Sequence, residues 1–109
     1  MISKFVKIAK ASEVAEGQMK SIKVGNDEIL IAHVGGQYYA VDNVCTHQGG
    51  WLDQGDILAD TLEIRCPLHE GCFDLRTGAA TCEPCTEPLA VYGVRVEGDD
   101  ILVGPPAQP

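Results

Sequence analysis

Residues 45–50 read CTHQGG and residues 66–78 read CPLHEGCFDLRTG, and these two stretches decide how the rest of the chain is interpreted. Each stretch places a cysteine shortly before a histidine; the four residues are Cys45, His47, Cys66 and His69. Thiolates and imidazoles are common ligands of transition metals in proteins. Two separate segments therefore each supply one sulfur and one nitrogen, and we expect them to meet at one metal centre.

The choice of metal depends on the arrangement of these ligands, because tetrahedral zinc accepts the same Cys2His2 set. Zinc fingers usually space a pair of cysteines and then a pair of histidines. Here each segment is mixed, and the cysteine leads the histidine both times. This order favours an asymmetric dinuclear cluster, while a structural zinc or a coincidental set of residues remains the alternative.

The two stretches resemble the cluster-binding motifs of Rieske proteins, with a Cys-x-His box followed by a Cys-Pro-x-His box. The resemblance covers essentially the whole chain, including EPLAVYGVRVEGDDILV at residues 87–103, and is to Rieske ferredoxin components of bacterial aromatic-ring dioxygenase systems. It implies one 2Fe-2S cluster. By this resemblance Cys45 and Cys66 bind the buried iron, while His47 and His69 bind the outer iron, where the electron would leave.

Strand-like patterns precede the first box. Residues 19–24 (MKSIKV) alternate apolar and polar side chains, and residues 28–34 (EILIAHV) and 38–43 (YYAVDN) form denser runs. Turn residues separate these runs at 25–27 and at 35–36. The pattern predicts two consecutive hairpins.

Strand-like patterns return after the second box, in residues 89–104 (LAVYGVRVEGDDILVG), around a turn at 98–100. A Pro-rich tail follows, which we expect to fray. Between residues 45 and 88, glycines and prolines interrupt any periodicity, and only residues 10–17 (KASEVAEG) could form one or two helical turns. The segment between the strands is therefore predicted to be rich in loops.

The fold class that follows is all-β. From the strand pattern we expect an antiparallel β-sandwich or a partly open barrel. The resemblance implies the Rieske iron-sulfur fold, a single domain over residues 1–109. Its loop-rich cluster-binding subdomain, at approximately 43–88, would be inserted between strands of a β-sandwich base.

Composition narrows the possible partners and the location. The chain has 109 residues, with 8 Lys and Arg against 16 Asp and Glu, and a formal charge of -8. This charge argues against nucleic acid or an anionic membrane as partner and favours a protein with a basic docking face, unless the acidity only aids solubility. No apolar run approaches the roughly 18 residues of a membrane span, and MISKFVKIAKASE lacks a signal-peptide core. We expect a soluble cytoplasmic protein.

Four positions bear on the reduction potential. Rieske proteins of respiratory cytochrome bc complexes carry an extra cysteine in each box, joined as a disulfide, where this chain has Gly50 and Leu68. The same proteins donate hydrogen bonds to the cluster from a serine and a tyrosine, where this chain has Gly71 and Phe73. Without those hydroxyl donors the reduced cluster is less stabilised. We therefore expect a low-potential carrier.

Catalysis by the chain itself is not expected. A mononuclear iron site needs two histidines and a carboxylate, and only His33, which we expect to be an ordinary packed or half-exposed side chain, is left outside the boxes. The resemblance implies a one-electron carrier between a flavin-dependent NAD(P)H reductase and a terminal aromatic-ring-hydroxylating oxygenase, with no small-molecule substrate of its own. The alternatives are a small Rieske subunit of another oxidoreductase, such as nitrite or arsenite oxidoreductase, and a redox or iron sensor.

Several residues near the boxes have open roles. We expect Cys72, Cys82 and Cys85 to be buried or semi-buried free thiols, although Cys82-x-x-Cys85 also suggests a second metal site or a redox pair. Trp51 is expected to pack rather than to relay electrons. By resemblance, Pro84 belongs to a loop that covers the cluster, unless it forms a simple turn. Glu70 is either part of a docking surface or a plain solvated side chain.

Overall fold

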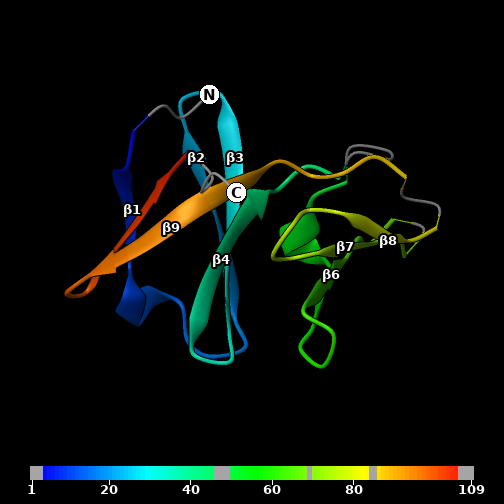
Figure 1. Ribbon diagram of the computed structural model, residues 1–109, viewed down its shortest axis with the longest axis horizontal. Helices are drawn as coiled ribbons and strands as arrows, with labels where there is room; N and C mark the ends of the chain where they lie inside the picture. The colour runs from blue at the N-terminus through cyan, green and yellow to red at the C-terminus, as the bar shows by residue number, and fades with distance from the viewer. Residues whose placement is uncertain (1–3, 46–49, 69, 84–85, 106–109) are drawn as a thin grey trace.

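Two antiparallel sheets lie side by side along the long axis of the molecule (Figure 1). The computed structural model describes residues 4–45, 50–68, 70–83 and 86–105. In these residues the larger sheet has the order β1-β10-β9-β4-β3-β2, formed by β1 (Val6–Lys10), β2 (Met19–Val24), β3 (Asp27–Val34), β4 (Gln37–Asp42), β9 (Val91–Glu97) and β10 (Asp100–Gly104). The smaller sheet has the order β5-β6-β7-β8, formed by β5 (Asp56–Leu58), β6 (Glu63–Arg65), β7 (Cys72–Asp74) and β8 (Ala80–Cys82).

The hairpins predicted in the larger sheet are confirmed. β2 pairs with β3 from Met19↔Ala32 to Val24↔Asp27, and β3 pairs with β4 in continuous register. β9 and β10 form the third hairpin. The predicted Pro-rich tail lies almost wholly at 106–109, outside the described residues.

The N-terminal part of the chain differs from expectation. Strand β1, which the sequence pattern did not predict, pairs with β10, and its register shifts between Lys7 and Ala9. This irregularity interrupts the strict alternation on which strand prediction depends. The helical turns expected at residues 10–17 reduce to one 3-10 turn, η1 (Ala11–Glu13).

Strand β3 is buried on both faces, which explains its dense apolar run. Ile29 and Ile31 share one core with side chains from β4 and β10, so the larger sheet folds over on itself as a sandwich. On the other face of β3, Leu30 and Ala32 belong to a second core. That core also contains residues of the segment between β4 and β9, namely Cys45, Leu52, Ile64, Cys66, Phe73, Leu75 and Leu89.

The segment between β4 and β9 contains more regular structure than its sequence predicts. It forms the smaller sheet and a second 3-10 turn, η2 (Leu52–Gln54). Each of its strands has three residues, too few for alternation to be detected. The subdomain limits of 43–88 stay a prediction. No helix in the described residues is long and apolar enough to cross a membrane.

Candidate metal centre

Both boxes are loops closed at their base by the same backbone hydrogen bond. The Cys45 N–H donates to the Gly50 carbonyl at 2.7 Å, and the Cys66 N–H donates to the Gly71 carbonyl at 2.8 Å. Each bond spans five positions, so described residues on either side of each predicted histidine are brought together. His47 and His69 themselves lie outside the described residues. The structure thus describes the two predicted sulfur ligands of the centre.

The two cysteines lie next to each other in the core between the sheets. Cys45 and Cys66 are 2% and 1% exposed, and their side chains are hydrogen-bonded. Burial raises the pKa of the Cys66 thiol, a hydrogen bond from the Leu68 backbone N–H lowers it in part, and the neighbouring Cys45 raises it further. Ionisation of two adjacent buried thiols is unfavourable unless a metal ion binds both of them as thiolates.

The two loops touch through Gly50 and Leu68. A Cβ added at Gly50 would lie 3.0 Å from Leu68 Cδ1 and 3.1 Å from Cys66 Sγ. Gly50 and Leu68 occupy the positions at which Rieske proteins of cytochrome bc complexes carry their disulfide. In this chain the two positions are joined by packing instead. Gly71 and the fully buried Phe73 add no hydroxyl group near the loops.

Comparison with known proteins decides the identity of the centre. The model of the Rieske [2Fe-2S] domain matches residues 4–93. The chain belongs to the Rieske [2Fe-2S] family. It therefore holds one Rieske 2Fe-2S cluster, and the adjacent buried thiols fit the sulfur-ligated half of such a cluster. The zinc alternative is set aside.

Similar ferredoxins belong to aromatic dioxygenase systems. The 3-phenylpropionate/cinnamic acid dioxygenase ferredoxin subunit of Shigella flexneri is 40% identical over 99 residues, which cover 90% of this chain and 92% of that protein. The ferredoxin of carbazole 1,9a-dioxygenase from Nocardioides aromaticivorans IC177 is 41% identical, with a TM-score of 0.89 over 95% of this chain and 100% of that one. A third match, a complex of reduced oxygenase and oxidised ferredoxin in carbazole 1,9a-dioxygenase, is 34% identical with a TM-score of 0.84 over 92% of each chain. The Rieske chain described here is accordingly an electron carrier and not a catalytic enzyme.

A polar network anchors the first box of this Rieske domain to the larger sheet. Asn43 is 1% exposed; its Nδ2 donates to Asp53 Oδ1, and its Oδ1 accepts from the Asp53 N–H, both at 2.9 Å. The Leu52 N–H donates to the Asn43 carbonyl at 2.8 Å. Ser21 Oγ on β2 donates to Asp53 Oδ2 at 3.2 Å. No local sequence pattern marks this network, because it joins Asn43 and Asp53 across the first box and Ser21 from a separate strand.

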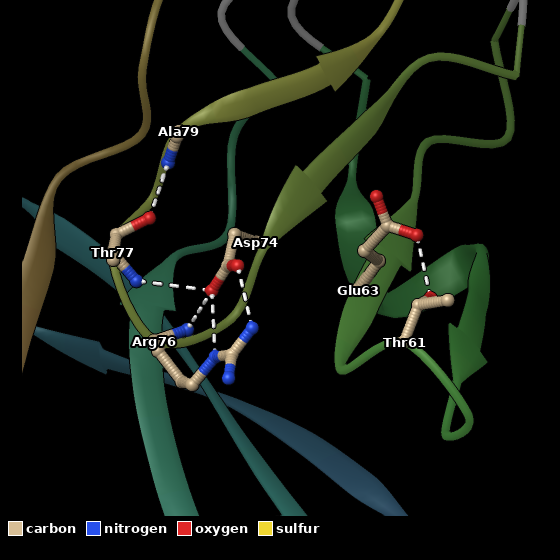
Figure 2. Close-up of polar contacts among 6 residues, drawn as sticks. All are labelled: Thr61, Glu63, Asp74, Arg76, Thr77 and Ala79. Carbon is tan, nitrogen blue, oxygen red and sulfur yellow. Dashed lines mark hydrogen bonds and ion pairs between the residues drawn. The ribbon is translucent and has the colours of Figure 1, made fainter.

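The turn after the second box is held by Asp74 (Figure 2). Its Oδ1 accepts from the backbone N–H groups of Arg76 and Thr77, at 2.7 and 3.2 Å, and its Oδ2 accepts from Arg76 Nη2 at 3.1 Å. Thr77 Oγ1 then accepts from the Ala79 N–H. The Asp-x-Arg-Thr-Gly order of the motif therefore encodes a tight turn between β7 and β8, a role that sequence analysis did not assign.

Three further residues named in the sequence analysis can be placed individually. Trp51 is 50% exposed, and the expectation that it packs rather than relays electrons stays a prediction. Glu70 is exposed and has a positive φ of 60° in the second loop. His33 is packed as expected: its Nδ1 lies 2.9 Å from the Val14 carbonyl oxygen, and its ring stacks on Tyr38. Pro84 and Cys85 lie outside the described residues.

Proposed function

We propose that Cys45 and Cys66 bind one iron of the cluster and that His47 and His69 bind the other. The observation that carries this assignment is the adjacency of the two buried thiols, each at the base of a loop closed by the same hydrogen bond. In Rieske centres two histidines replace two cysteines on one of the two irons. When bound, such a cluster accepts and releases one electron at a time.

This assignment is tested by replacing one predicted ligand and, as a control, a cysteine outside the ligand set. We expect Cys66→Ser to abolish the visible absorption and the EPR signal of a reduced Rieske cluster. Cys82→Ser removes a different partly buried thiol and should leave both signals intact. The ligand set would be wrong if Cys66→Ser kept its full cluster content. It would also be wrong if Cys82→Ser lost the cluster and Cys66→Ser did not.

We further propose that the chain carries electrons in the cytoplasm, from a flavin-dependent NAD(P)H reductase to a terminal aromatic-ring-hydroxylating oxygenase. The support is its likeness to ferredoxins named as components of dioxygenases, one of them in a complex with an oxygenase. The protein's own contribution is to shield the sulfur ligands. Cys45 and Cys66 share one buried core with Leu52 and Phe73, while Trp51 is on the surface.

Reconstitution tests the role as a carrier. Purified ferredoxin should restore NAD(P)H-dependent hydroxylation of an aromatic substrate by a reductase and an oxygenase that show little turnover without it. It should behave as a free protein that cycles between the two. Tight co-purification with one large oxidoreductase and no stimulation of an oxygenase would favour the alternative of a fixed subunit.

The residues around the thiols support a low midpoint potential. Gly71 and Phe73 carry no hydroxyl group, while the Leu68 N–H donates to Cys66. Fewer hydrogen bonds to sulfur leave the reduced, more negative cluster less stabilised, so we place the potential toward the bottom of the roughly -150 to +300 mV Rieske range. A redox titration measures it, and a midpoint above about +100 mV would contradict the proposal.

A further inference from the structure

Two cysteines outside the cluster site face each other across the smaller sheet. Strands β7 and β8 are antiparallel, and Cys72 pairs with Cys82 at a point where their register shifts, between Cys72 and Phe73. A regular antiparallel pair places opposed Cα atoms about 4.5–5.5 Å apart, within the roughly 4.4–6.8 Å range of disulfides. Because the shift interrupts that regular spacing, the hydrogen bond between the two side chains is the observation that brings the sulfurs within reach of each other.

The side chains of this pair are in contact but unequally exposed. Cys72 is 3% exposed, and its Sγ lies 3.7 Å from the Glu70 carbonyl oxygen as a donor. Cys82 is partly exposed. Burial, followed by the hydrogen bond with Cys82, raises the pKa of the Cys72 thiol to about 12. A soluble reagent would therefore react first at Cys82, with Cys72 protonated behind it.

We propose that Cys72 and Cys82 form a reversible cross-strand disulfide when the ferredoxin meets a low-molecular-weight disulfide such as oxidised glutathione. The thiolate of Cys82 attacks one glutathione sulfur, the S–S bond breaks, and one glutathione leaves as a thiol. Cys72 then loses its proton to solvent and attacks the sulfur of Cys82, releasing the second glutathione. Two protein thiols are oxidised and one glutathione disulfide is reduced to two thiols.

The position of the pair gives this reaction a structural consequence. β7 begins directly after the Gly71 carbonyl that closes the second box, and β8 ends at Cys82. A disulfide would fix the strand behind the second box to its neighbour without using Cys45 or Cys66. Disulfides that form inside cells are usually transient or redox-sensing. We infer a thiol switch beside the cluster-binding loops.

Counting thiols in defined variants tests the pair. The chain has five cysteines. After treatment of the holoprotein with oxidised glutathione, unfolding and removal of the cluster in the presence of a blocking reagent should leave two fewer free thiols, and reductant should restore them. Cys85→Ser should still lose two thiols. Cys72→Ala and Cys82→Ser should lose none to an internal bond.

The main competitor is a bond between Cys82 and Cys85. It predicts the reverse pattern, with loss of two thiols in Cys72→Ala and none in Cys85→Ser, and that result would overturn the proposal. Peptide mapping of the oxidised wild-type protein decides the question without any variant, because it must contain a Cys72–Cys82 crosslink. A map with Cys72 unmodified would also overturn it. The visible spectrum reports on the cluster separately, so the pair and the cluster assignment can fail independently.

Discussion

Gly78 closes the turn between β7 and β8 in a conformation that only glycine accepts there. Its φ is 80°, and an added Cβ would lie 2.2 Å from the Leu89 carbonyl oxygen. The Gly78 carbonyl in turn accepts the Leu89 N–H at 2.7 Å. A side chain at Gly78 would push the turn between β7 and β8 away from the segment that leads into β9.

We expect Gly78→Ala to destabilise the protein well beyond the cost of a positive φ alone. The matched control is Gly98→Ala, because Gly98 has a φ of 64° but open space around its Cβ position. The control should lose about 1–2 kcal/mol. Gly78→Ala should lose roughly 1–3 kcal/mol more, since the backbone must shift. Urea unfolding measures both, and equal losses would contradict the steric argument.

The carboxylate of Asp74 makes stability depend on pH. The Arg76 side chain and the N–H groups of Arg76 and Thr77 hold the pKa of Asp74 below its usual value. The ionised form therefore contributes stability above the unfolded-state pKa of about 3.9, and this contribution is lost as pH falls through the lower folded value. Asp74→Asn should reduce the loss of stability on acidification.

Thermal unfolding between neutral and acid pH measures this effect. Asp60→Asn is the control, because Asp60 is an exposed carboxylate in the turn between β5 and β6. Both variants remove one negative charge. A pH dependence of Asp74→Asn that matches the wild type, or an equal change in Asp60→Asn, would argue against the role of the turn.

At the scale of elements, prediction from sequence succeeded where periodicity extends over a whole strand. The hairpins formed by β2, β3 and β4 follow from long runs separated by turn residues. The short strands β5 to β8 could not be found, although each pairs with the next strand along the chain. Each has three residues, too few for an alternating pattern to be detected.

The candidate site shows the same limit. The Cys and His boxes are local motifs, and sequence sufficed to select them. The contacts that support the boxes are not local: Asn43 with Asp53, Gly50 with Leu68, and Cys72 with Cys82. Such contacts join positions whose proximity depends on the tertiary fold. The sequence therefore predicts candidate ligands, whereas the structure shows what holds the loops that carry them.

Asn43 links the first box to the larger sheet, and its removal should loosen that box. Asn43→Ala leaves the Asp53 N–H and carboxylate without their buried partner, at a cost of roughly 1–3 kcal/mol. Ser21→Ala, the control, removes one neutral donor to Asp53 and should cost less than about 1.5 kcal/mol. Thermal unfolding and the rate of cluster loss are the measurements. Similar losses in the two variants would place the anchor elsewhere.

At the scale of the whole molecule, the larger sheet forms the supporting sandwich, and the segment that contains the smaller sheet carries the cysteines of the metal centre. The chain leaves the larger sheet after β4, builds the smaller sheet, and returns as β9 (Figure 1). β3 faces a core on each side, so one strand supports both the sandwich and the segment that carries Cys45 and Cys66. The smaller sheet therefore lies at one end of the molecule, away from the β9–β10 hairpin at the other (Figure 1).

Because the second box and the end of β9 are far apart, charge removal at these two positions can test whether local charge guides the encounter with a partner. Because the ferredoxin has a formal charge of -8, its reduction by a reductase with a basic docking face should slow as ionic strength rises, by roughly tenfold or more if electrostatic steering operates.

Two variants locate the charge that matters. Glu70→Gln removes an exposed charge in the second box, and Glu97→Gln removes an exposed charge at the end of β9. Both change the net charge equally. Because steering acts mainly within a Debye length of the contact, Glu70→Gln should weaken the salt dependence more than Glu97→Gln in stopped-flow reduction. Equal effects would mean that only net charge matters, and a rate insensitive to salt would exclude electrostatic steering.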